Sequence, residues 1–241
     1  MNDAPPRNAD GLPPNADGLP AIAGGWAEQV VGVAHRRGTR TFRLLTPADP
    51  DAVLDAVVAD QGAEAGGDPY WATLWPVAVT FAGRLLDEPF PAGTRVLELG
   101  CGSALAGLAA AAGGAEATAT DVDPRAVALA AANAALNGLP LTAAKLDWHA
   151  PPALSADQRF DRAIGADLLY QPDLHAALLK TLSATLAADG EALLADPGRG
   201  VAAAFLHRAS DAGWRVRLED EAGKELWRPR IAGHQIVRLS R

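Results

Sequence analysis

The sequence predicts an α/β fold with a doubly wound, mostly parallel sheet. From residue 95 onward, short apolar runs of strand length alternate with longer runs that have helical periodicity. This alternation is typical of a parallel sheet that helices cover on both faces. A glycine-rich turn at residues 100–102 follows the first of these strands, and doubly wound sheets bind their ligands at such turns.

The N-terminal quarter of the chain differs from this alternation in composition. Residues 1–25 are rich in proline, glycine, asparagine and aspartate and poor in large apolar residues, so we expect a disordered tail. Apolar runs at 30–33 and 41–45 flank a basic turn. This pattern predicts a β-hairpin that begins near Trp26.

Between the hairpin and the alternating region we expect two helices joined by a loop. The first helix opens at Pro50, a glycine-rich loop covers 62–69, and the second helix covers 77–86. The chain is therefore expected to divide into the tail, a hairpin and helical extension over 26–90, and a ligand-binding core over 91–241.

Within the core, strands and helices alternate regularly. Strands are expected at 95–99, 117–120, 160–165, 191–195 and 235–239, and helices at 105–112, 124–136, 174–187 and 201–212. The second helix has clear ends, with Asp123 at the N-cap and Gly138 at the stop. The last strand is expected at an edge or in the reverse direction.

Composition limits the class of protein. The 29 acidic and 21 basic residues give a net charge of −8, which argues against the broad positive surface that binds nucleic acid. Cys101 is the only cysteine, so no intrachain disulfide forms, and the sequence has no metal-ligand spacing. Because no signal peptide or membrane span is evident, we expect a cytoplasmic protein without a membrane partner.

The glycine turn and a later acidic residue indicate an adenosine-type ligand. Gly100 and Gly102 allow the backbone to approach a ligand closely. Asp121 ends the next strand roughly 20 residues later, where an acidic side chain accepts hydrogen bonds from ribose hydroxyls.

Two details favour S-adenosylmethionine over a dinucleotide. The dinucleotide fingerprint requires a glycine three positions after Gly102, but the next glycine is Gly107. Glu98 stands just before the turn, where its carboxylate would repel a pyrophosphate but suits the ammonium of a methionine moiety.

Residues 96–103, Val-Leu-Glu-Leu-Gly-Cys-Gly-Ser, resemble the first motif of the Rossmann-like, seven-β-strand S-adenosylmethionine-dependent methyltransferases. The resemblance implies a seven-stranded sheet, with Asp121 as the ribose-binding acid. In this motif the residues implied at the cofactor are Glu98, Gly100, Cys101 and Gly102. Asp147 and Trp148 match the pair that contacts adenine, by a hydrogen bond and by stacking, and the alternative for Trp148 is packing in the core.

Three further segments resemble protein-lysine methyltransferases of this class. Residues 167–170, Asp-Leu-Leu-Tyr, resemble an Asp-x-x-Tyr signature, and the aromatic segment 70–76 resembles the stretch ahead of their first motif. Residues 196–199, Asp-Pro-Gly-Arg, are similar to a segment of the branch that includes the electron-transfer flavoprotein β-subunit lysine methyltransferases.

The resemblance implies roles for individual side chains. Asp167 and Tyr170 are the expected catalytic residues, because Asp167 can orient an incoming ammonium and Tyr170 can hydrogen-bond the nitrogen. Asp167 and Trp75 are also expected at the cofactor. The residues expected to bind the substrate are Trp71, Tyr170 and Arg199, with Trp71 or Trp75 walling a channel by cation–π contact.

Each of these roles has a structural alternative. Trp71 and Trp75 are four residues apart and could pack on one helical face. Asp167 could cap a loop while Tyr170 packs under a helix, and residues 196–199 could be only a turn with a surface arginine. The five histidines show no ligand spacing, and we expect most of them to be solvated.

The sequence therefore predicts an N-methyltransferase that acts on a lysine side chain of a protein. The alternatives are a small-molecule N-methyltransferase that takes a small amine and an inactive, cofactor-binding regulatory protein. Adenine-base methylation is disfavoured, because residues 167–170 lack the prolines of the Asn/Asp-Pro-Pro-Tyr motif. The sequence does not indicate the oligomeric state.

Overall fold

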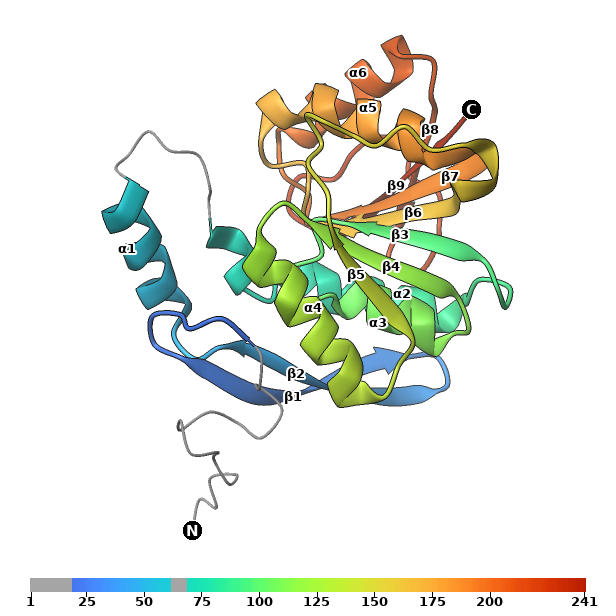
Figure 1. The fold of residues 1–241 in the computed structure, drawn as a ribbon. Coiled ribbons are helices and arrows are strands. Elements are labelled where there is room, and N and C mark those ends of the chain that lie inside the picture. The colour runs from blue at the N-terminus through green and yellow to red at the C-terminus, as the bar shows by residue number, and fades with distance from the viewer. Residues whose placement is uncertain (1–18, 62–68) are drawn as a thin grey trace.

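The computed structural model describes residues 19–61 and 69–241, and a seven-stranded sheet dominates it (Figure 1). The strand order is β5-β4-β3-β6-β7-β9-β8. The strands are β3 Arg95–Leu99, β4 Glu116–Asp121, β5 Leu141–Lys145, β6 Phe160–Ala166, β7 Leu186–Asp196, β8 Arg215–Asp220 and β9 Gln235–Ser240. Strands β3 to β7 are mutually parallel, and β9 is antiparallel to both of its neighbours. The predicted doubly wound, mostly parallel sheet is confirmed.

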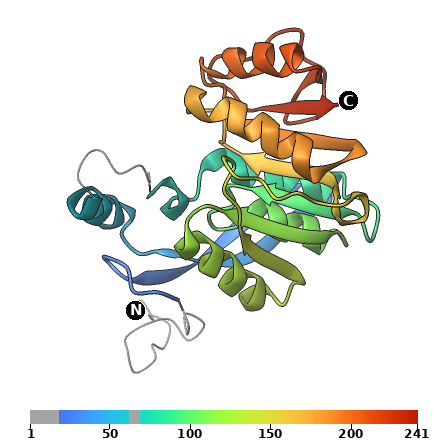
Figure 2. The ribbon, with the colours of Figure 1, turned by 45° about the horizontal axis from the view of Figure 1, so that its top comes forward.

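Helices cover both faces of this sheet (Figure 2). The helices are α2 Pro76–Asp87, α3 Leu105–Ala112, α4 Pro124–Asn137, α5 His175–Thr185 and α6 Ala202–Asp211. Side chains alternate across strand β3: Val96 packs in a cluster with α2 and α3, while Leu97 and Leu99 pack in a cluster with α5 and α6. None of the helices in the described part of the chain is long and apolar enough to cross a membrane.

The predicted ends of helix α4 are confirmed. Asp123 caps the N-terminus, because its Oδ1 accepts a hydrogen bond from the Arg125 N–H at 2.8 Å. Gly138 follows the last turn with φ of 61°, the left-handed conformation that glycine adopts easily.

A β-hairpin, β1 Trp26–His35 and β2 Gly38–Pro47, lies across helices α2 and α4 (Figure 1). Phe42 and Leu44 of β2 belong to the same apolar cluster as α2 and α3. Helix α1, Pro50–Gln61, follows the hairpin as predicted. The extension and the sheet therefore share hydrophobic packing.

One buried amide fixes the hairpin to the rest of the fold. Asn133 of α4 accepts a hydrogen bond from the Leu45 N–H at 2.7 Å and donates to the Leu45 carbonyl at 3.2 Å. The same amide nitrogen donates to the Ser103 carbonyl at 3.0 Å. Asn133 thus links β2 directly to the glycine turn at 100–102.

Residues 19–25 are the part of the predicted tail that the structure describes. Leu19 and Ile22 pack against the cluster that contains Trp26, and the Trp26 indole donates to the Pro20 carbonyl at 2.9 Å. Residues 19–25 therefore contact the fold. Residues 1–18 and most of the predicted loop at 62–69 lie outside the described residues.

Two boundaries in the C-terminal half differ from the predictions. The predicted helix over 174–187 ends at Thr185, and β7 begins at once, because Phe160 of β6 pairs with Leu186 before the register shifts. The strand predicted at 235–239 is β9, and it runs antiparallel to its neighbours, which was one of the two expectations for it. It does not lie at the edge of the sheet, where β8 lies instead.

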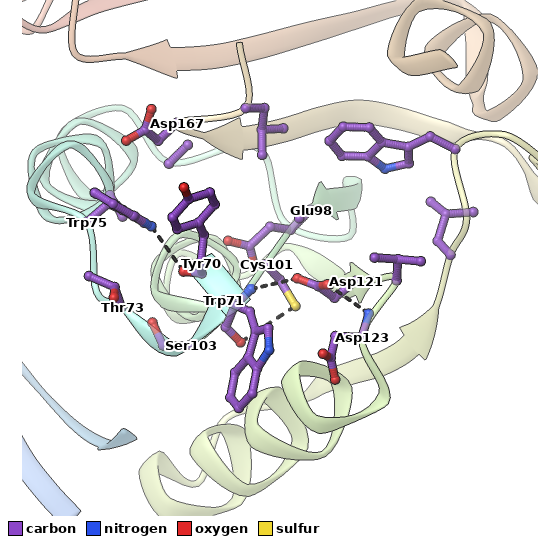
Figure 3. A pocket seen from close by; sticks show the side chains of 18 of the residues that line it. Tyr70, Trp71, Thr73, Trp75, Glu98, Cys101, Ser103, Asp121, Asp123 and Asp167 are labelled. Atoms are coloured by element: carbon purple, nitrogen blue, oxygen red, sulfur yellow. Dashed lines mark hydrogen bonds between the residues drawn. The ribbon is translucent and has the colours of Figure 1, made fainter. Parts of the chain in front are cut away.

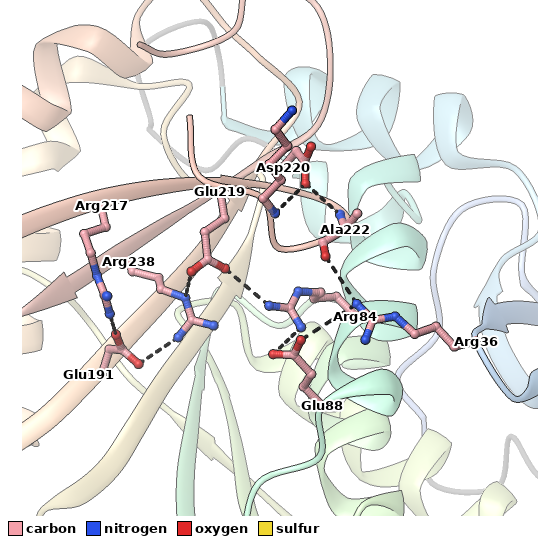
Figure 4. A network of polar contacts seen from close by, with 10 residues as sticks. Arg36, Arg84, Glu88, Glu191, Arg217, Glu219, Asp220, Ala222 and Arg238 are labelled. Carbon is pink, nitrogen blue, oxygen red and sulfur yellow. Dashed lines mark hydrogen bonds and ion pairs between the residues drawn. The ribbon is translucent and has the colours of Figure 1, made fainter. Parts of the chain in front are cut away.

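A network of ion pairs connects β8 and β9 to helix α2 (Figure 4). Glu219 of β8 binds Arg238 of β9 at 2.7 Å and the buried Arg84 of α2 at 3.3 Å. Glu191 of β7 binds Arg238 at 2.9 Å and Arg217 at 3.4 Å. The charges of the edge strand are thus matched by its neighbours.

Candidate functional site

A cavity of about 640 Å³ lies at the carboxyl ends of β3, β4 and β6 (Figure 3). This volume suits a cofactor or another small molecule. The predicted site residues that line it are Trp71, Trp75, Glu98, Gly100, Cys101, Gly102, Asp121, Asp147, Trp148, Asp167 and Tyr170. Arg199 is the one predicted residue that does not line the cavity.

The glycine turn presents backbone to the cavity. Gly100 and Gly102 have φ of 57° and 48°, in the left-handed region. This backbone conformation favours glycine at position 100, where a Cβ would also come within 2.7 Å of the end of the Leu168 side chain. The Cys101 N–H donates to the Thr120 carbonyl at 2.9 Å, which holds the turn against β4.

Glu98 is a buried carboxyl at the floor of the cavity. Its Oε2 accepts a hydrogen bond from the Gly107 N–H at 3.0 Å, and a Cβ at Gly107 would overlap that oxygen. Burial, together with the neighbouring charge of Asp121, raises the pKa of Glu98 to about 8, although the hydrogen bond from the Gly107 N–H opposes the rise. A cation in the cavity would stabilise the ionised form.

Asp121 is fixed between the glycine turn and the start of helix α4. Its Oδ2 accepts from the Gly102 N–H at 3.1 Å, and its Oδ1 accepts from the Asp123 N–H at 3.0 Å (Figure 3). Burial raises the pKa of this carboxyl, while the backbone N–H groups oppose the rise. The side chain is thus held rigidly at the cavity wall.

Asp147 and Trp148 follow β5 on another wall. Asp147 Oδ1 accepts from the His149 N–H at 2.8 Å. Trp148 is half-buried and packs against the cluster that contains α5 and α6, yet its ring also borders the cavity near Gly100. The structure therefore combines the packing alternative with a position at the cavity.

The opposite end of the cavity is aromatic. The Tyr70 ring lies edge-on to Tyr170 at 5.4 Å and to Trp75 at 5.9 Å between centroids. The Trp75 indole donates to the Tyr70 carbonyl at 3.1 Å. Tyr70 was not among the predicted site residues, although it belongs to the aromatic segment that the sequence singles out.

Trp71 and Trp75 do not share a helical face, but Trp71 is buried in an apolar cluster and Trp75 packs against another, so both side chains contribute to the core as well as lining the cavity. Trp71 lies in a short 3₁₀ turn, Pro69–Ala72, whereas Trp75 is the N-cap of α2. The Trp71 ring packs on Trp26 at 6.2 Å, with the Arg125 guanidinium 5.1 Å from its centroid. Trp71 therefore borders the glycine turn rather than the aromatic end.

Arg199 reaches the site through Asp167. Its Nε and Nη2 donate to the two Asp167 oxygens at 2.8 Å each, and this hydrogen bonding raises the pKa of Arg199. The guanidinium also lies 5.8 Å from the Trp75 ring and 5.9 Å from the Tyr170 ring. Asp167 itself has φ of 57° and is buried.

The segment 196–199 is both a turn and part of the site. Asp196 Oδ1 accepts from the N–H groups of Gly198 at 2.7 Å and Arg199 at 3.1 Å, which is the turn signal seen in the sequence. This turn aims Arg199 at Asp167.

His175 differs from the expectation that most of the histidines are solvated. It is buried, and its Nε2 lies 3.0 Å from the Leu169 carbonyl oxygen.

This sheet, with a cavity above a glycine turn, has the fold of the Rossmann-like S-adenosylmethionine-dependent methyltransferases. A solved example, a 16S rRNA methyltransferase of T. thermophilus in complex with AdoMet and guanosine, superposes with a TM-score of 0.55. The match covers 92% of this chain and 51% of that chain at 18% identity, and it shows likeness of fold alone.

More particularly, the chain belongs to the lysine methyltransferase family, whose model matches residues 65–209. It is 35% identical over 137 residues to the electron transfer flavoprotein beta subunit lysine methyltransferase of Xenopus laevis, covering 55% of this chain and 54% of that protein. It is 30% identical over 146 residues to the calmodulin-lysine N-methyltransferase of Arabidopsis thaliana, covering 56% and 48%. The chain thus spans about half the length of these relatives.

Proposed function

We propose that the protein transfers a methyl group from S-adenosylmethionine to the side-chain nitrogen of a lysine in a protein. The observation that carries the proposal is one cavity lined by the buried carboxyl of Glu98, by Asp167, whose carboxylate binds Arg199, and by the rings of Tyr70, Trp75 and Tyr170. Membership of the lysine methyltransferase family supports the choice of acceptor.

The residues of the cavity fit the cofactor. Glu98 would bind the ammonium of the methionine moiety, and its raised pKa reflects a buried anion with no cation beside it. Asp121 would accept hydrogen bonds from the ribose hydroxyls through its remaining lone pairs. Asp147 would bind the adenine by a hydrogen bond and Trp148 by stacking. The glycine turn, with its left-handed backbone, would leave room for the methionine moiety of the cofactor.

When bound, the cofactor supplies an activated methyl group on a sulfonium. The protein must then hold a neutral amine in line with that group and exclude water. A free lysine has a pKa of about 10.4, so its ammonium must lose a proton first. The positive charge of Arg199 favours the neutral amine, because a second cation beside it in a desolvated site is disfavoured, while the rings of Tyr70, Trp75 and Tyr170 exclude water from the entrance.

Asp167 and Tyr170 would position the acceptor. Asp167, held by Arg199 at 2.8 Å, has lone pairs left to accept a hydrogen bond from the amine N–H and so direct its lone pair. Tyr170 would hydrogen-bond the same nitrogen through its hydroxyl. The long, unbranched stem of lysine suits an entrance walled by aromatic rings.

The test is methylation with radiolabelled S-adenosylmethionine. The purified protein is incubated with a cell extract and, separately, with purified electron-transfer flavoprotein β-subunit, and the labelled protein is hydrolysed to amino acids. We expect labelled methyllysine, and none with Glu98→Ala. Label confined to small molecules would overturn the proposal, and so would S-adenosylhomocysteine binding without any methylated product.

We also propose a cytoplasmic location, since the lone Cys101 suits a reducing compartment.

A further inference from the structure

The loop between β8 and β9, residues 221–234, exposes two large apolar side chains. Trp227 is 99% exposed and Ile231 is 85% exposed, more than any other large hydrophobic side chain in the described residues. Four residue steps separate them, which limits their backbone separation to about 14 Å. Neighbouring exposed apolar side chains of this size are typical of interaction surfaces.

The loop is held in place by its backbone. The Ala232 N–H donates to the Gly198 carbonyl at 2.9 Å, and the Gly233 N–H donates to the Pro197 carbonyl at 3.0 Å. At the other end of the loop, Arg36 donates to the Ala222 carbonyl at 3.2 Å (Figure 4). Trp227 and Ile231 therefore project from an anchored loop, which lowers the entropy cost of binding a partner.

The loop lies at the same edge of the sheet as the cavity. Gln235, the first residue of β9, pairs with Asp196 at the end of β7 and with Asp220 at the end of β8. The segment bonded to Ala232 and Gly233 is the turn that aims Arg199 at Asp167. The loop segment that directly follows Ile231 thus contacts the turn that carries Arg199.

The charge of the loop contrasts with that of the chain. The chain has a net charge of −8, whereas the loop carries Lys224, Arg228 and Arg230 against Glu221 and Glu225, a net charge of +1. Arg230 pairs with Glu221 at 2.8 Å and with Asp220 at 3.5 Å. Arg228 is exposed next to Trp227 and presents its charge outward. An acidic partner surface would complement it.

We propose that Trp227, Arg228 and Ile231 form a docking surface for the acceptor protein. The complementary surface is an apolar depression rimmed by acidic side chains, close to the lysine that enters the cavity. This inference rests on the proposed protein-lysine methylation, because a small amine would not need such a surface. Exposed tryptophan and arginine side chains are the types that dominate binding energy at interfaces.

Two variants test the surface, each with a matched control. Trp227→Ala/Ile231→Ala removes the apolar side chains, and Arg228→Glu reverses the charge. Val30→Ala removes an apolar side chain that is 69% exposed on the hairpin, and Arg215→Glu reverses an exposed charge at the far end of β8. The readouts are the initial rate of labelling of the protein fraction of a cell extract at low extract concentration, calorimetric binding of S-adenosylhomocysteine, and sedimentation.

We expect both surface variants to lower the labelling rate by about tenfold or more. The controls should retain the wild-type rate, and all variants should bind S-adenosylhomocysteine equally. Undiminished labelling by the surface variants would overturn the docking surface and leave the proposed function standing. A wild-type dimer that both surface variants dissociate would assign the surface to a second copy of the chain. No labelling of any protein by the wild type would overturn the proposed function and this inference with it.

Discussion

Arg199 binds both carboxylate oxygens of Asp167, Nε to Oδ1 and Nη2 to Oδ2, at 2.8 Å each. The charge of Asp167 is therefore matched before any acceptor arrives. An incoming ammonium gains little from a carboxylate that already holds a cation, whereas a neutral amine can still donate a hydrogen bond to it. Under the proposed function, the pair would therefore favour the neutral amine, which is the protonation state that methyl transfer requires.

Replacing Arg199 should shift the pH dependence of turnover. In Arg199→Met the acceptor lysine loses a neighbouring positive charge, so its pKa stays nearer to about 10.4 and the rate rises at higher pH than in the wild type. Arg199→Lys keeps the charge without the planar fork and should show a smaller shift. The measurement is kcat against pH, and superimposable profiles would refute the role.

Tyr170→Phe should lower turnover and leave cofactor binding unchanged. The phenylalanine ring keeps the edge-on contact with Tyr70 and lies under the Arg199 guanidinium, so only the hydroxyl is lost. We expect kcat to fall by about tenfold to a hundredfold, the scale of a lost positioning hydrogen bond. If only the melting temperature falls, Tyr170 has a packing role.

Cofactor binding should release a proton from Glu98. With a pKa of about 8, this carboxyl is mostly protonated in the free protein at neutral pH. An ammonium bound beside it favours the carboxylate, so most of one proton should leave at about pH 7. Calorimetry of S-adenosylhomocysteine binding in buffers of different ionisation enthalpy measures this release, and Glu98→Gln should abolish it.

The same shift gives Glu98 a defined effect on stability. A carboxyl whose pKa is raised in the folded state favours folding while it is protonated, and this contribution is lost as the pH rises through about 8. Glu98→Gln, which stays neutral, should therefore unfold at a higher temperature than the wild type near pH 8. If the wild type and Glu98→Gln had equal melting temperatures at every pH from about 5 to about 8, this would contradict the raised pKa of Glu98.

Gly107→Ala should weaken cofactor binding and lower the melting temperature. Helix propensity alone predicts the opposite, since alanine favours a helix interior by about 1 kcal/mol over glycine. At this position, however, the added Cβ would overlap Glu98 Oε2 and displace the carboxylate. Calorimetric affinity for S-adenosylhomocysteine and thermal unfolding measure the two effects. Raised stability with intact affinity in the Gly107→Ala variant would show that the carboxylate can move freely.

The sequence predicts elements whose signals are local. The ends of β3 and α3 agree with the predicted ranges, because each is a mainly apolar segment with glycine close to both of its ends. Strand β8 was missed, since Arg217 and Glu219 give it a polar appearance that only their partners on β7, β9 and α2 explain. The residues of β8 alone do not indicate which side chains of other elements will pair with its charges.

The candidate site divides in the same way. Glu98, Asp121 and the glycine turn are predicted from spacing, because each lies at or next to the C-terminal end of a strand. The sequence does not predict the ion pair between Asp167 and Arg199, because the two residues are 32 positions apart. They meet because β6 and β7 are parallel neighbours, which brings the C-terminal ends of these two strands together. Gly107 was noted for failing a dinucleotide pattern, and its positive reason, contact with Glu98, needs the packed structure.

The hydrogen bonds of Asn133 to Leu45 and Ser103 bear on how the chain can be shortened or varied. A protein trimmed to residues 91–241 would leave that amide without its hairpin partners while it still held the residue next to Gly102. Loss of these buried hydrogen bonds should destabilise the trimmed chain and loosen the backbone at Ser103. Substitutions in β2 that disturb Asn133 should therefore change cofactor affinity without any contact with the cofactor.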